Sequence, residues 1–161
     1  MASQRRSLLA GRNRAGLTRE EIRRVTTIFL GLDRNVNARH EPGAQTAFHV
    51  SLSEEGEEIG EVVFGPDIYP GRGIVDANSS LSVEAAAAHE LTHFHRWKDK
   101  AELSVGELTH LDEALTSLQA IQRYDRHLSE TDVRQLISDA IQRIHLYLEE
   151  IAPGEAEDRE E

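Results

Sequence analysis

The chain has 161 residues, 39% of them hydrophobic and 29% charged, and a formal net charge of −11, which suits one acidic domain large enough to bury a core. It contains no cysteine, which excludes disulfides and thiolate ligands, so any metal site must use His and carboxylate side chains. No segment is apolar for long enough to form a signal peptide or to cross a bilayer, and we expect a cytoplasmic protein without a membrane partner.

Residues 1–17 form the first segment, which we expect to be a flexible basic arm. Residues 1–40 hold nine arginines against three carboxylates, a net charge of +6, so residues 41–161 carry −17. Such an arm can contact nucleic acid, an acidic partner or the acidic remainder of its own chain. We favour the last and do not expect a nucleic-acid partner, because a body with this charge repels phosphate.

A single domain is predicted over residues 18–152, and it begins with a helix over 18–32. Thr18 and Glu21 have the spacing of a capping box, and the apolar residues that follow recur at helical intervals. A loop is expected over residues 33–45.

Three strands are predicted next, over residues 46–52, 59–64 and 73–77. The first alternates polar and apolar residues with period two. The segment Glu54-Glu55-Gly56-Glu57 predicts a hairpin turn between the first strand and the second.

Three helices are predicted in the second half of the chain, over residues 82–98, 105–126 and 130–151. Ser82 is the expected N-cap of the first, and the other two each carry an apolar stripe that we expect to face the core. The stripes consist of Leu108, Leu111, Leu115, Leu118 and Ile121, and of Val133, Leu136/Ile137, Ala140/Ile141, Ile144 and Leu148. Pro153-Gly154 is expected to end the last helix, before a disordered acidic tail over 153–161. The order of elements predicts an α+β fold, with a small, mostly antiparallel three-stranded sheet packed against helices.

The most informative motif is His89-Glu90-Leu91-Thr92-His93, within the helix predicted over 82–98. Positions i and i+4 lie on one face of a helix, so both imidazoles can hold one ion, and tetrahedral Zn²⁺ suits two nitrogen ligands. Glu90 lies beside the pair but off its row, where it can take a proton from an attacking water. The alternative is a solvated helix with two surface histidines, but Leu91 and Phe94 leave no clean polar face.

A third protein ligand is needed, because catalytic zinc sites usually have three ligands and an open position. Glu113 points away from the leucine stripe of its predicted helix and is a candidate. On the residues alone, a solvated glutamate is the simpler explanation of this position. His110 lies one turn earlier on nearly the same face, where it is an alternative ligand or a hydrogen-bond partner of Glu113.

The combination of His89-Glu90-x-x-His93 with a helical Glu113 resembles the zincin metallopeptidases, and among them the gluzincins, in which a glutamate from a following helix completes the site. Residues 46–125 also resemble the small bacterial metallopeptidases of the ImmA/IrrE type. The resemblance implies a zincin-like active-site helix, Zn²⁺ held by His89, His93 and Glu113, and Glu90 as the catalytic base.

The chain departs from the metzincin branch of the zincins. Metzincins extend the motif with a glycine and a third His, where this chain has Arg96 and Asp99, and Met1 is its only methionine. Asp99 stays an alternative ligand, because an aspartate fills that place in some relatives, although Arg96 removes the glycine that allows the bend.

Other histidine and aromatic side chains carry weaker signals. We expect His95 to be a packing or surface residue and Trp97 to lie in the core or to cover the motif helix. One of three side chains could stabilise an oxyanion, although each is more simply structural: Tyr124, His127 and His145.

These features predict a zinc metallopeptidase of the endopeptidase type and, by analogy with the resembled family, a regulatory enzyme with a specific protein target. Its peptide substrate is expected to add to a sheet edge around Val62-Val63-Phe64 or Gly73-Ile74-Val75. The alternatives are a catalytically inactive zinc-binding interaction module, a metal-dependent hydrolase of a non-peptide amide, and a nucleic-acid-associated protein that uses the basic arm.

Overall fold

The structure is a computed structural model that describes residues 11–71, 80–106 and 108–157. In chain order its elements are α2 (Arg19–Leu32), β1 (Ala38–His40), β2 (Ala47–Leu52), β3 (Glu58–Phe64), the 3-10 helix η1 (Pro66–Ile68), α3 (Val83–Lys98), α4 (Thr109–Tyr124) and α5 (Glu130–Glu157). The predicted α+β class is confirmed. Among the described residues, none of the helices combines the length and apolarity that a membrane span requires.

The described sheet has the strand order β1-β3-β2. β2 pairs with β3 as the predicted antiparallel hairpin, whereas β1 pairs with β3 in parallel, so the sheet is mixed. β1 lies inside the segment predicted as a loop, and that prediction was wrong. A three-residue strand is too short to show alternation, and it forms because Ala38 to His40 can pair with the buried end of β3. The strand predicted over 73–77 lies outside the described residues.

α2 begins at the predicted capping box. The Thr18 hydroxyl accepts a hydrogen bond from the amide of Glu21 at 3.2 Å, and the Glu21 carboxylate accepts one from the amide of Thr18 at 2.9 Å. Val25 and Phe29 are buried, and the ring of Phe29 stacks on that of Phe64 from β3 at a centroid distance of 5.6 Å. These contacts attach α2 to the sheet.

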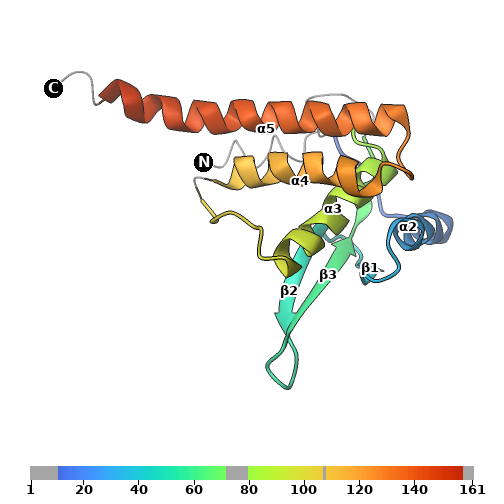
Figure 1. Ribbon diagram of the computed structural model, residues 1–161. Helices are drawn as coiled ribbons and strands as arrows, with labels where there is room; N and C mark the ends of the chain where they lie inside the picture. The colour runs from blue at the N-terminus through green and yellow to red at the C-terminus, as the bar shows by residue number, and fades with distance from the viewer. Residues whose placement is uncertain (1–10, 72–79, 107, 158–161) are drawn as a thin grey trace.

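α3 is the central helix, with the sheet on one side and the antiparallel pair α4 and α5 on the other (Figure 1). The Ser82 hydroxyl caps it by accepting from the amide of Ala85 at 3.0 Å, as predicted. Ala85, Ala87 and Ala88 are fully buried. Small side chains let neighbouring elements approach this helix closely on several sides.

α4 begins at Thr109, four residues later than predicted. Gly106 has φ +115°, a left-handed conformation that cannot continue into a right-handed helix. The predicted leucine stripe does not form the buried face, since Leu118 is 39% exposed. The buried residues of α4 are instead mostly small or polar: Ala114, Thr116, Ser117, Ala120 and Tyr124. Such side chains allow the helix to approach α3, which the hydrophobic pattern alone could not indicate.

α5 is longer than predicted, because it continues through Pro153 and Gly154 to Glu157. A proline removes one backbone donor but does not oblige the helix to end there. Its predicted stripe is divided: Leu136 and Ala140 are buried, whereas the isoleucines beside them are exposed. The C-terminal part of α5 extends past the start of α4 (Figure 1).

Candidate metal centre

His89, His93 and Glu113 lie together between α3 and α4. The Nε2 atom of His89 is 2.8 Å from Oε2 of Glu113 and 3.1 Å from Nε2 of His93. Nε2 of His93 is 3.2 Å from Oε2 of Glu113. Among the described residues, this is the group of three His or carboxylate side chains whose donor atoms converge closely enough to hold an ion. The structure therefore brings together the three residues that the sequence nominates as ligands.

The spacing of these three atoms can be compared with what zinc requires. For bonds of about 2.0–2.1 Å in a tetrahedron, neighbouring ligand atoms lie about 3.3–3.4 Å apart. The distances of 2.8, 3.1 and 3.2 Å are shorter, so the ligand atoms need to separate by about 0.1–0.6 Å. Two nitrogens and one carboxylate oxygen are also a donor set that Zn²⁺ accepts, and the residues therefore fit the ion.

A buried hydrogen-bond chain orients His89. The hydroxyl of Ser117 donates to Oδ2 of Asp139 at 2.5 Å, and its oxygen lies 2.8 Å from Nδ1 of His89. Because Ser117 gives its only hydrogen to the carboxylate, its oxygen accepts from Nδ1–H of His89. This tautomer leaves a lone pair on Nε2, the atom that faces Glu113 and His93. Arg143 pairs with the other oxygen of Asp139 at 3.5 Å.

The electrostatics of the cluster favour a positive charge at its centre. Burial lowers the pKa of His93, but the hydrogen bond and charge of Glu113, with the charges of Glu90 and Asp112, raise that pKa to about 9. Burial raises the pKa of Glu113, whereas its contacts with the two histidines and their positive charge when protonated hold that pKa well below the usual range. Lone pairs and a carboxylate converge here, so either a proton or a divalent cation stabilises the arrangement.

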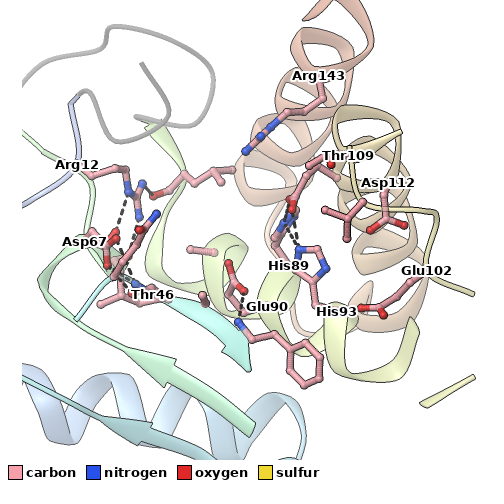
Figure 2. A pocket seen from close by; sticks show the side chains of 18 of the residues that line it. Arg12, Thr46, Asp67, His89, Glu90, His93, Glu102, Thr109, Asp112 and Arg143 are labelled. Carbon is pink, nitrogen blue, oxygen red and sulfur yellow. Dashed lines mark hydrogen bonds and ion pairs between the residues drawn. The ribbon is translucent and has the colours of Figure 1, made fainter. Parts of the chain in front are cut away.

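Glu90 lies beside the cluster (Figure 2), and its carboxylate contacts the start of β2. Its Oε2 atom accepts a hydrogen bond from the backbone amide of Phe48 at 3.1 Å. Burial raises the pKa of Glu90, although the charges of His93 and His89 act in the opposite direction. A raised pKa makes this carboxylate a stronger base than an ordinary glutamate.

The two alternative ligands lie elsewhere. Asp99 is exposed after the end of α3, where its carboxylate is 4.0 Å from the guanidinium of Arg123. His110 pairs across α4 and α5 with Glu150 at 3.0 Å. The structure brings neither side chain into the cluster.

Asp112 is also engaged away from the ligands. Its carboxylate pairs with the guanidinium of Arg96 and accepts from the amide of Leu103 at 3.0 Å. Arg96, which is 3% exposed, donates a further hydrogen bond to the carbonyl of Ala101. Arg96 therefore fixes the α3–α4 connection to α4.

The remaining side chains singled out in the sequence have structural partners or are exposed. His95 and Tyr124 both contact Oδ2 of Asp33, at 2.7 and 3.1 Å, and so connect α3 and α4 to the end of α2. Trp97 packs against Phe48 at a centroid distance of 5.6 Å, which covers the motif helix as expected. The other two candidates for oxyanion stabilisation are exposed: His127 and His145.

A cleft of about 420 Å³ opens onto the cluster and is lined by α3, α4 and residues 45–48. Arg12, Thr46 and Asp67 lie at one end of it and His89, His93 and Glu102 at the other (Figure 2). Its sheet wall is β2, an edge strand in the described sheet. The prediction that residues 62–64 form this edge was wrong, because β3 is paired on both sides. The alternative edge at 73–75 lies outside the described residues.

Arg12 anchors the described part of the N-terminal segment to the body. Its guanidinium donates to the carbonyls of Asp67 and Ile68, both at 2.8 Å, and to that of Leu81 at 2.6 Å. The amide of Asn13 donates to the carbonyl of Tyr69 at 3.1 Å. We expected this segment to be flexible, but these bonds hold its described part against η1 and against Leu81, just before α3.

Sequence reasoning missed three features of the site: Ser117, Asp139 and the amide of Phe48. Ser117 is four residues after Glu113 and so shares its helix face, a signal that was available. Asp139 and the Phe48 amide belong to other elements and carried no such signal. No family model matches the chain, and neither does any curated protein or solved structure.

Proposed function

We propose that this protein is a zinc-dependent metallopeptidase that hydrolyses peptide bonds with Glu90 as general base. The observation that supports it most is the convergence of His89, His93 and Glu113 within hydrogen-bond distance, next to the part-buried carboxyl group of Glu90 with its raised pKa. A structural zinc site needs four protein ligands and no adjacent base. Three ligands beside a cleft are the arrangement expected of a catalytic site.

The ligands divide their roles by position. His89 and His93 present nitrogen atoms from successive turns of α3, and Glu113 contributes a carboxylate from α4. When bound, the ion supplies the Lewis acidity that polarises the scissile carbonyl and acidifies the attacking water. Ser117 keeps the His89 ring in the tautomer that offers Nε2 to the centre.

Glu90 carries the proton in this proposal. The Phe48 amide holds Oε2, which leaves Oε1 to accept a proton from the attacking water. Attack forms the carbon–oxygen bond, and cleavage of the carbon–nitrogen bond follows as Glu90 returns the proton to the leaving amine. The raised pKa of Glu90 suits the first transfer, because a more basic carboxylate takes the proton of the attacking water more readily.

The substrate is proposed to be an extended peptide that adds to the outer edge of β2. Phe48 directs its amide away from β3, so the amide of Val50 points out of the same edge by the alternation of an antiparallel ladder. Backbone hydrogen bonds along such an edge hold a peptide irrespective of its sequence. An intracellular regulatory role with one protein target, in the cytoplasm, remains the working hypothesis for its biology.

The test compares the wild type with Glu90→Gln, which keeps the size of the side chain and removes its basicity. The variant is expected to bind zinc as the wild type does and to lose cleavage of a peptide library. Asp112→Asn is not a suitable control, because it breaks the pair with Arg96; Glu102→Gln, on the exposed rim of the cleft, is preferred. Equal cleavage by Glu90→Gln would show that the assigned mechanism is incorrect.

Two other functions are separated by the same experiment. A zinc-binding interaction module would bind the ion and cleave nothing, and a hydrolase of non-peptide amides would act on small amides while leaving peptides intact. The position of Glu90, part-buried in the cleft beside the ligands, favours catalysis over the module, since a purely structural site needs no base there.

A further inference from the structure

One face of α5 carries an apolar stripe that the described part of the chain leaves uncovered. Eleven large hydrophobic residues are exposed among the described residues, and five of them belong to this stripe. Their exposed fractions lie between 36% and 51%, and they are Ile137, Ile141, Ile144, Leu148 and Ile151. We refer to these five residues as the α5 stripe.

The α5 stripe has the spacing of a helix–helix seam. Successive members are separated by four, three, four and three residues, so at about 100° per residue they stay within an arc of about 80° over about 21 Å of helix. This is the a/d pattern of a coiled coil, which buries such a stripe against a second helix. α4 does not serve as that helix, because α5 turns Leu136, Asp139 and Ala140 toward the interior instead.

The charges beside the α5 stripe indicate which partner suits it. The chain has a net charge of −11, and two copies repel each other over most of their surface. The positions that border the stripe carry no carboxylate: Ser138 and His145 on one side, Ala140 and Tyr147 on the other. Asp139 and Glu150 face Ser117 and His110 within the same chain. A second copy can therefore approach this face without opposing carboxylates.

We propose that the α5 stripe is the interface of a homodimer in which two α5 helices pack antiparallel around Ile144. In this arrangement Ile144 meets its own copy, and Ile137 lies opposite Ile151. Parallel pairing would bring the two acidic bodies to the same end, since α2, α3 and the sheet lie beside the first part of α5 (Figure 1).

The first test is the mass of the protein in solution, measured by light scattering or sedimentation from low to high micromolar concentration. The wild type is expected to reach twice the 18.0 kDa of one chain. The double variant Ile141→Glu with Ile144→Glu is expected to stay at the mass of one chain, because it places like charges at the centre of the seam. Leu52→Glu is the matched control: it changes a residue that is 71% exposed outside the stripe and should preserve the dimer.

The second test fixes the orientation, and the absence of native cysteine makes it direct. Ile144→Cys is expected to give a covalent dimer on mild oxidation, because the two copies of this position meet. Ile137→Cys alone should stay uncrosslinked but should form a mixed dimer with Ile151→Cys. A wild type that is monomeric at every concentration would overturn the dimer and would leave the stripe to a different protein. Self-crosslinking of Ile137→Cys would overturn the antiparallel arrangement.

Discussion

Ser117→Ala tests how the buried hydrogen-bond chain supports the metal centre. The substitution removes the oxygen that lies 2.8 Å from Nδ1 of His89 and leaves Nε2 of that residue in place. It also removes the 2.5 Å hydrogen bond to Asp139, which is 1% exposed. The ring of His89 then loses the acceptor that sets its tautomer and its orientation.

The expected effect can be given a magnitude. Loss of a residue that orients a ligating histidine typically costs 10- to 100-fold in metal affinity. At 1.4 kcal/mol for each factor of ten, this corresponds to about 1.4–2.8 kcal/mol of binding free energy. The metal-free protein also loses stability, because hydrogen bonds to charged groups contribute about 1.5–3 kcal/mol. Asp139 retains its ion pair with Arg143, which limits that loss.

The assay is competition for Zn²⁺ against a chromophoric chelator, with folding checked by circular dichroism. Thr116→Val is the matched control, because Thr116 is equally buried on α4 but donates to the carbonyl of Asp112 and does not contact His89. Both variants should lower the melting temperature, and only Ser117→Ala should weaken zinc binding. Equal zinc affinity in Ser117→Ala and the wild type would refute the proposed role of the chain.

Three further predictions concern stability. Burial raises the pKa of Asp33, but hydrogen bonds, led by that from His95, outweigh burial and hold this pKa below 3.8. The ionised carboxylate therefore stabilises the fold above pH 3.8, and this stabilisation is lost as the pH falls through the pKa of the folded state. Asp33→Asn should therefore lower the melting temperature at neutral pH, and a difference that did not shrink in acid would contradict this assignment. Gly60→Ala places a Cβ 2.7 Å from the Trp97 ring and should cost about 1–3 kcal/mol in denaturant unfolding, whereas Gly31→Ala, with open space around it, should not destabilise the protein. Zinc at 100 times its dissociation constant should stabilise the fold by about 2.7 kcal/mol, and a melting temperature indifferent to zinc and chelator would argue against a specific site.

The parts that sequence reasoning predicted are local in the chain. The caps of α2 and α3 depend on residues three positions apart, and the alignment of His89 with His93 depends on one helical turn. The proximity of Glu113 to this pair depends on how α4 packs, and from its helix face alone a solvated glutamate was the simpler explanation. The residue types indicated the chemistry of the ligands. They did not indicate that Glu113 contacts the two histidines.

The failures have a common physical origin in tertiary packing. The leucine stripe of α4 was expected inside because large apolar residues usually are, yet Ala114, Ser117 and Ala120 form the buried face instead. The stripe of α5 raises the same issue: its period is helical, but a period does not say whether the covering partner belongs to the same chain. The edge of the sheet was misplaced because strand order is not encoded in alternation.

The metal content of the purified protein is the most direct test of the central claim. Elemental analysis of the wild type is expected to give one zinc ion for each chain, and Glu113→Ala should lose most of it while keeping its helical content. Asp99→Ala, altered at an exposed carboxylate away from the cluster, should retain the full amount. A wild type without zinc after purification and dialysis against the metal, or a Glu113→Ala variant that binds it as tightly, would contradict a site built from His89, His93 and Glu113.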